Sequence, residues 1–193
     1  KSLNNHLNIA VCGAGNFTKR VHLPNLKKFG DNLSIGAIVC RTGSNAMQLA
    51  QQYGANYASS SIEDVFSDPD INAVLISTRH NLHAEMTLTA LEAGKNVFVE
   101  KPLAMTEKEL MDIESFYKSK NNSTIEKLPM LMVGYNRRFS PMMTSIKQLT
   151  DNRKYPLVMN YQMNAGYLSP DHWLRTGEGG GRNIGEACHI YDL

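Results

Sequence analysis

The sequence predicts an α/β protein with a doubly wound parallel sheet, followed by the beginning of an α+β domain with an antiparallel sheet. Short apolar runs typical of buried parallel strands alternate with helical stretches between residues 8 and 135. The first run leads directly into a glycine turn and then into a helical stretch. From residue 156 to residue 164 apolar and polar side chains alternate, which is typical of a strand with one solvated face.

Six parallel strands are expected before the pattern changes. They lie at residues 8–12, 33–41, 56–58, 73–77, 96–100 and 130–135. Helices are expected from the glycine turn toward residue 29 and at residues 44–53, 61–66, 83–94 and 106–120, with a polar loop at 121–129. Gly54 is expected to end the second helix, and capping boxes at residues 61–64 and 106–109 mark two helix starts.

Two domains are expected, at residues 1–135 and 136–193. The second begins with a helix after Pro141, contains the alternating strand and a loop that holds Trp173, and ends in a helix that opens near Asn183. The chain starts without Met and stops inside a helical stretch, so we interpret it as a piece of a longer protein.

Charge and cysteine content exclude several classes of protein. With 20 Lys and Arg against 18 Asp and Glu, the net charge of +2 gives no field that favours nucleic acid or an anionic membrane. The three cysteines lie far apart in no metal-ligand spacing, which predicts buried thiols, no disulfide and no metal site. No apolar run approaches the roughly 20 residues of a membrane helix, and the first residues lack a signal-peptide pattern. A cytoplasmic location follows.

The turn after the first strand contains Gly13 and Gly15, followed by Asn16 and Phe17. Two such glycines let the backbone turn tightly and approach a pyrophosphate, whose charge the amides of the helix N-terminus would meet. Thr18 stands where the usual pattern has a third glycine. An ordinary βα turn is the alternative.

The end of the second strand points to a choice of dinucleotide. An NAD site usually offers a carboxylate to the ribose diol there, whereas this chain has Arg41, Thr42 and Ser44. These side chains suit the 2′-phosphate of NADP through charge-assisted hydrogen bonds. The alternative is that Arg41 stacks on the adenine, which favours neither NADP nor NAD.

Other candidates follow later strands. Lys101 lies between Glu100 and Pro102, and because a proline disfavours the α region for the preceding residue, this lysine is expected at the open end of the fifth strand. The alternative is a surface cation. Polar side chains with an expected cofactor or substrate contact also follow the fourth and sixth strands: Thr78, His80, His83, Asn136 and Arg137. Either histidine is alternatively a structural residue at a helix start.

Near the end of the chain, Glu186 and His189 have the spacing of one helix face. A carboxylate beside an imidazole predicts a general base. The alternative is that Glu186 caps the helix by pairing with Asn183.

In order along the chain, the segments GAGN, TRHNLH, EKPLA, GYNRRFSP and GGG ahead of a histidine helix resemble the Gfo/Idh/MocA oxidoreductases. The resemblance covers essentially the whole chain. It implies a Rossmann domain joined to a second domain whose open antiparallel sheet mediates dimers or tetramers. It also implies NADP- or NAD-linked hydride transfer at a hydroxyl or ketone of a sugar, nucleotide sugar or cyclitol.

The resemblance also implies roles for individual residues. Lys101 would bridge the nicotinamide ribose and the substrate hydroxyl, Pro102 would follow a cis bond, and His189 would be the catalytic histidine. The family pattern places Asp four residues before that histidine, where this chain has Gly185 with Glu186 beside it.

The segments GYNRRFSP and GEACH resemble members found beside, or fused to, zinc-type alcohol dehydrogenase domains. A catalytically silent nucleotide-binding module, acting as a sensor or as a partner of a fused domain, is the alternative function. A flavodoxin-like binding protein would not explain the alternating pattern after residue 151.

Overall fold

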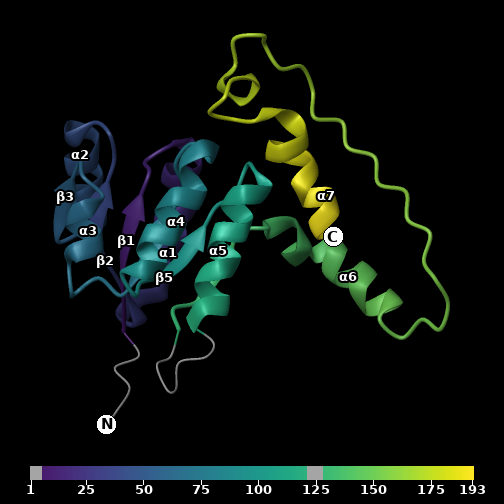
Figure 1. Cartoon of the computed structure of the whole chain (residues 1–193), viewed down its shortest axis with the longest axis horizontal. Coiled ribbons are helices and arrows are strands. Elements are labelled where there is room, and N and C mark those ends of the chain that lie inside the picture. Colours follow the sequence, from purple (N-terminus) through teal and green to yellow (C-terminus); the bar gives the residue numbers. More distant parts are fainter. Residues whose placement is uncertain (1–5, 121–127) are drawn as a thin grey trace.

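The computed structural model describes residues 6–120 and 128–193 and contains a parallel sheet of six strands (Figure 1). The spatial order is β3-β2-β1-β4-β5-β6, which is the Rossmann order. The strands are β1 (Leu7–Cys12), β2 (Leu33–Val39), β3 (Tyr57–Ser59), β4 (Ala73–Ile76), β5 (Asn96–Val99) and β6 (Leu131–Val133). The predicted doubly wound sheet is confirmed.

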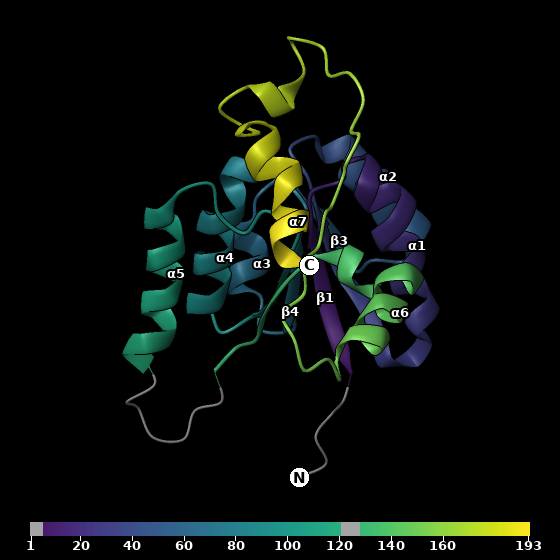
Figure 2. The same ribbon diagram turned by 90° about the vertical axis from the view of Figure 1, so that its right-hand side faces the viewer.

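Helices cover both faces of this sheet (Figure 2). One face carries α1 (Leu23–Leu26) and α2 (Gly43–Tyr53), and the other carries α3 (Glu63–Ser67), α4 (His83–Glu92) and α5 (Glu107–Lys120). The helical stretch around α1 is irregular, since a π-helix at Thr18–His22 precedes it and a 3-10 helix at Lys27–Asn32 follows it. A further 3-10 helix at His80–Leu82 leads into α4.

Strand periodicity explains why two cores form. Successive strand residues point to opposite faces, so Ile9 and Val11 pack under α1 and α2 while Ala10 and Cys12 pack toward α4. All four side chains are almost completely buried. Burying a side chain the size of Val or Ile contributes about 1.5–3 kcal/mol. Both cores contain such residues, Val11 in one and Val74 in the other, so both faces of the sheet contribute to stability.

Two of the predicted helix ends are confirmed. The Thr106 hydroxyl accepts from the Glu109 amide at 3.2 Å, and the Glu109 carboxylate accepts from the Thr106 amide at 3.0 Å, which is a capping box. Gly54 has a left-handed φ of 69° at the end of α2.

The capping box expected at residues 61–64 is wrong. The Ser61 hydroxyl contacts Glu63 instead, and Ser59 donates to Asp64 at 2.5 Å. Because α3 begins at Glu63, Ser61 is one residue too far from the helix to act as its N-cap.

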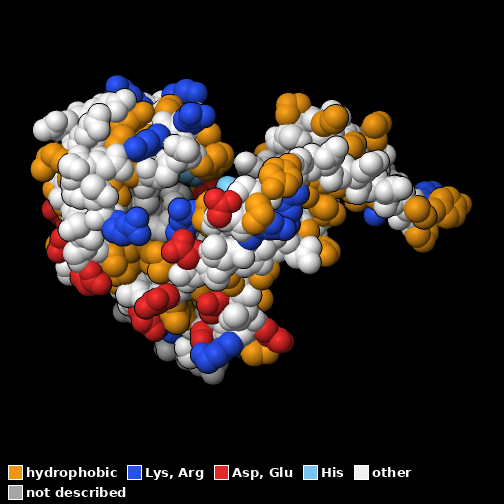
Figure 3. Space-filling model, turned by 90° about the horizontal axis from the view of Figure 1, so that it is seen from above, with side chains coloured by type: hydrophobic (Ala, Val, Ile, Leu, Met, Phe, Trp, Pro, Cys, Tyr) orange, Lys and Arg blue, Asp and Glu red, His pale blue; other side chains and the backbone are white. Residues whose placement is uncertain are grey.

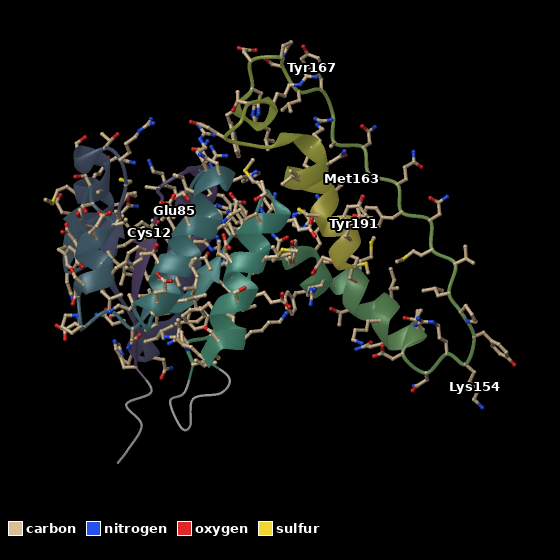
Figure 4. The ribbon with its side chains drawn as sticks, in the orientation of Figure 1. Cys12, Glu85, Lys154, Met163, Tyr167 and Tyr191 are labelled. Atoms are coloured by element: carbon tan, nitrogen blue, oxygen red, sulfur yellow. The ribbon has the colours of Figure 1, made fainter. Side chains whose placement is uncertain are left out.

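Beyond the sheet, a 3-10 helix at Asn136–Phe139 leads into α6 (Pro141–Thr150). The chain then runs as an extended segment around Lys154 and Tyr167 (Figure 4), passes through a 3-10 helix at Trp173–Arg175, and ends in a π-helix at Asn183–Ala187 and α7 (Cys188–Asp192). The helices predicted after Pro141 and near Asn183 are therefore present.

The strand expected at residues 156–164 is not formed, and the described residues contain no antiparallel sheet. A strand needs a neighbour for its backbone N–H and C=O groups, and this segment makes no backbone–backbone hydrogen bond to another described segment. Its apolar side chains are exposed, as are those of α6, and they gather on the part that projects away from the sheet (Figure 3).

The three cysteines are free, as the sequence predicts. Only Cys12 is buried, because Cys40 and Cys188 are partly exposed. Among the residues with described positions, no helix is both long and apolar enough to cross a membrane. Most of the expected polar loop at 121–129 lies outside the described residues, and the domain boundary at residue 136 stays a prediction.

Gly13→Ala should lower the free energy of unfolding by about 2–4 kcal/mol, because Gly13 has φ 101° and an added Cβ would lie 2.5 Å from the Ser77 carbonyl oxygen. Gly15→Ala in the same turn should change stability little, since no heavy atom lies within 4 Å of its added Cβ. Urea unfolding of both variants measures the difference, and equal losses would contradict this account.

Candidate functional site

The glycine turn lies between β1 and the helical stretch that begins at Asn16. The Gly13 amide donates to the Val39 carbonyl at 2.8 Å, and the Lys19 amide donates to the Gly15 carbonyl at 3.0 Å as the helix starts. The first amides of a helix have no intrahelical acceptor. Asn16 and Phe17 are exposed residues and the space above Gly15 is open, so the first amides of this helical stretch suit a pyrophosphate. The turn therefore fits a dinucleotide.

At the neighbouring strand end, Arg41, Thr42 and Ser44 are all exposed. No hydrogen bond or ion pair to the Arg41 guanidinium occurs among the described residues. These three side chains are therefore accessible to an anionic group at the end of β2, as their positions in the sequence predict.

The segment Glu100, Lys101 and Pro102 leaves the end of β5, and a different element holds each residue. The Glu100 carboxylate accepts from His22 Nε2 at 2.9 Å, Lys101 Nζ donates to the Gly185 carbonyl, and the Pro102 carbonyl accepts from His83 Nδ1 at 2.7 Å. The Lys101–Pro102 peptide bond is cis, as the family resemblance implies. Lys101 is thus fixed at the open end of the sheet.

The contact between Lys101 and Gly185 joins the sheet to the helical turn ahead of α7. A Cβ at Gly185 would lie 2.8 Å from Leu174 Cδ2 and 3.0 Å from His80 Cε1. A side chain at this position would therefore have to displace the side chains of Leu174 and His80. His80 and Leu174 occupy the space of the missing side chain.

His189 lies close to Lys101 and is only 6% exposed. Burial lowers the pKa of its imidazole, and the positive charges of Lys101 and Arg137 lower it further, against weaker opposing effects of Glu100 and Asp192. Its Nδ1 is buried and has no hydrogen-bond partner among the described residues. The ring is therefore neutral near pH 7 and able to accept a proton.

The expected pairing of Glu186 with His189 is not formed. Glu186 Oε1 lies 3.6 Å from Arg182 Nε instead, and no side-chain cap joins Glu186 to Asn183. The π-helix at Asn183–Ala187 is wider than an α-helix, so residues three apart do not keep the shared face that α-helical spacing predicts. A catalytic part for Glu186 stays a prediction.

The loop after β4 is occupied by packing contacts. His80 Nδ1 donates to the Gly179 carbonyl at 2.9 Å, and its ring lies 4.8 Å from Trp173. Arg79 lies over the same indole at 4.3 Å and pairs with Glu178 at 3.5 Å. The loop therefore anchors residues 173–180 to the sheet.

His83 is also held by packing contacts. The side chain is 1% exposed. Its Nδ1 donates to the Pro102 carbonyl, and its Nε2 lies 3.3 Å from the Thr78 carbonyl oxygen. These contacts match the structural alternative for both histidines of the loop, and cofactor contact by Thr78, His80 and His83 stays a prediction.

A cavity of about 200 Å³ brings three predicted cofactor residues together: Phe17, Glu100 and Asn136. Its wall also includes His22 and Phe98. Arg137 instead donates to Tyr161 Oη at 3.3 Å and contacts Met163 Sδ at 3.0 Å; Met163 lies on the extended segment near α7 (Figure 4).

His22, Arg79 and Trp173 also belong to this region, although their positions in the sequence do not predict it. Only the fold brings their partners near them, since Glu100 and Glu178 are far away in the sequence. No local pattern marks a hydrogen bond over such separations.

A Rossmann sheet with this glycine turn defines a dinucleotide-binding α/β protein. Residues 7–126 match the Gfo/Idh/MocA family, described as an oxidoreductase family with an NAD-binding Rossmann fold. The chain belongs to that family. The predicted resemblance and the predicted class of cofactor, NADP or NAD, are thereby confirmed.

Two curated relatives illustrate the similarity. The chain is 33% identical over 135 residues to 4-carboxy-2-hydroxymuconate-6-semialdehyde dehydrogenase of Sphingobium sp., covering 70% of this chain and 40% of the relative. It is 29% identical to inositol 2-dehydrogenase/D-chiro-inositol 3-dehydrogenase of Lactiplantibacillus plantarum, in a match that covers 86% of this chain and 46% of the relative. The chain thus spans less than half the length of these relatives.

Solved structures share the fold. Scyllo-inositol dehydrogenase from Lactobacillus casei, solved with NAD(H) and scyllo-inositol, has a TM-score of 0.67 at 23% identity, covering 76% of this chain and 41% of that one. KijD10, a 3-ketoreductase from Actinomadura kijaniata solved with NADP and TDP-benzene, has a TM-score of 0.65 at 22% identity. The match covers 76% of this chain and 43% of KijD10.

Acid should destabilise this region through His80. Burial lowers its pKa from 6.5 to about 4, so the unfolded chain binds the proton first and stability is lost as pH falls from about 6.5 toward 4. Protonation of His80 alone should lower the free energy of unfolding by about 1 kcal/mol per pH unit in this range. Urea unfolding at several pH values should show a shallower loss for His80→Asn than for wild type. Parallel profiles would contradict the assignment.

Proposed function

We propose that this chain is part of an oxidoreductase that transfers a hydride between NADP or NAD and a hydroxyl or ketone of a sugar, nucleotide sugar or cyclitol. The observation that carries the proposal is the meeting of Lys101 with the turn that leads to the buried, neutral His189. The names of relatives such as the inositol dehydrogenase support the substrate class.

The nicotinamide dinucleotide would accept or supply the hydride. Gly13, Gly15 and the Asn16 amide would hold its pyrophosphate, since the turn is open above Gly15. Arg41, Thr42 and Ser44 would bind a 2′-phosphate, which favours NADP. The remaining cofactor contacts that we propose are Phe17, Thr78, His80, His83, Glu100, Lys101, Pro102, Asn136 and Arg137.

His189 would take the hydroxyl proton during oxidation and return it during reduction. Its lowered pKa keeps the ring neutral near pH 7, and neither ring nitrogen is engaged in a hydrogen bond among the described residues. Passing this proton on through Glu186 would require its partly exposed carboxylate to turn from Arg182 toward His189, since the two side chains do not pair in this structure.

Lys101 would donate a hydrogen bond to the substrate oxygen and stabilise the negative charge that develops there. An ammonium group has three N–H donors, so Lys101 can keep its bond to the Gly185 carbonyl while donating a second one. A donor of this kind is worth about 3 kcal/mol in the transition state.

The whole protein's organisation is part of the proposal. We assign residues 1–135 to the dinucleotide-binding domain and residues 136–193 to the start of a substrate and oligomerisation domain. Exposed apolar side chains on α6 and the extended segment, including Met142 and Val158, support a second sheet that assembles into homo-oligomers. The enzyme would act in the cytoplasm, either alone or fused to another domain.

A catalytically silent nucleotide-binding module is the second candidate. The presence of Gly185, packed against Leu174 and His80, where the family pattern has an aspartate favours it. Fluorescence titration with NADPH and NADH, followed by absorbance assays with a panel of polyols and keto sugars, separates the two candidates. A silent module would bind the nucleotide and never change its redox state.

Lys101→Ala and His189→Ala should each lower kcat by on the order of 100-fold or more, because each removes a group that acts on the transferred proton or the substrate oxygen. Binding of NADPH, measured by fluorescence, should change little. Lys108→Ala is the control, since that side chain is 84% exposed and its one ion pair with a described residue is to Asp112 on α5. Unchanged turnover in both site variants would contradict the proposed function.

Arg41→Ala should weaken NADPH binding by about tenfold or more and leave NADH binding nearly unchanged, because only NADPH carries a 2′-phosphate for the guanidinium. Fluorescence titration of both dinucleotides measures the ratio. Equal losses for both would instead support stacking of Arg41 on the adenine.

A further inference from the structure

His22 is 78 positions away from Glu100 in the sequence but lies beside it in space. Glu100 is the residue directly before Lys101. His22 Nε2 lies 2.9 Å from Glu100 Oε1, and the two side chains are only 14% and 15% exposed. The imidazole also makes edge contacts with Phe17 at 5.0 Å and with Phe98 at 5.7 Å. A single side chain therefore joins the helix of the glycine turn to the end of β5.

Glu100 has little freedom to move. Its amide donates to the Ile76 carbonyl at 2.8 Å, and its Oε1 would lie 3.1 Å from a Cβ at Gly134. A partly buried carboxylate needs a donor to offset its lost hydration. Among the described residues, His22 is the one side chain that donates to it.

We propose that His22 is a positioning residue, which holds Glu100 in place and thereby fixes the adjacent Lys101 for its reaction. This inference rests on the proposed function, because Lys101 matters only if it acts on the substrate oxygen. The hydrogen bond ties Lys101 to the same helical stretch that begins at the glycine turn, so the lysine and the dinucleotide turn keep a fixed separation.

The charges around the site agree with this assignment. Glu100 is the first of the carboxylates that raise the pKa of His189, against Lys101 and Arg137, which lower it. Keeping the Glu100 carboxylate in one place therefore also keeps constant the field at the imidazole.

Two substitutions separate the hydrogen bond from simple packing. His22→Phe keeps an aromatic ring between Phe17 and Phe98 but removes the donor. His22→Gln loses the ring but retains an N–H group that can donate to Glu100. If His22 only packs, the Phe variant should be the better enzyme; if it positions Glu100, the Gln variant should be.

We expect His22→Phe to lower kcat and kcat/KM together by on the order of 10-fold. The loss of a hydrogen-bond partner that orients a metal ligand has an effect of similar size in metalloenzymes. His22→Gln should recover most of that loss, and Kd for NADPH should stay within about twofold. His6→Phe is the matched control, because His6 is exposed and pairs with Ser34.

A second measurement needs no substrate. Labelling with an amine-reactive reagent, followed by peptide mass spectrometry, reports how firmly Lys101 is held on the Gly185 carbonyl. Lys101 should react several-fold faster in His22→Phe and at the wild-type rate in His22→Gln, with Lys108 as the internal standard.

Equal turnover and equal Lys101 labelling in wild type and His22→Phe would overturn the proposal, as would a Phe variant that outperforms the Gln variant. If Lys101→Ala is inactive while His22→Phe is normal, only the positioning role fails. If Lys101→Ala is fully active, the proposed function itself fails.

Discussion

The arrangement of the site depends on how the chain leaves β5. Three consecutive residues there are held by three different elements: Glu100 by the helix of the glycine turn, Lys101 by the turn ahead of α7, and Pro102 by the start of α4. Each contact uses a hydrogen bond in a partly or fully buried place, where an unmade bond is costly. The cofactor turn, the lysine and the histidine helix are therefore one connected unit.

The electrostatics of that unit favour a neutral histidine. Burial and two nearby cations outweigh the carboxylates around His189, and the same lysine that approaches Gly185 is one of those cations. In the proposed reaction, Lys101 would stabilise the oxyanion and the neutral imidazole of His189 would take the proton.

The second part of the chain is attached differently. Arg79 and His80 hold the Trp173 loop through a cation–π contact, an ion pair and a hydrogen bond, whereas residues 155–164 have no backbone hydrogen-bond partner in the part of the chain that the structure describes. The loop is fixed by side chains that can bond locally, but a strand requires another strand. This difference explains why the loop is anchored and the alternating segment is only extended.

Residue patterns alone determined the Rossmann sheet, the glycine turn, the capping box of α5 and the place of Lys101, because each depends on periodicity or on residues close in sequence. Only the tertiary structure decided what surrounds them. His22 meets Glu100 across 78 positions, Glu186 turns to Arg182 on a π-helical turn, and Gly185 packs closely against His80 and Leu174. Such contacts arise from how elements pack, and the local sequence of neither partner encodes them.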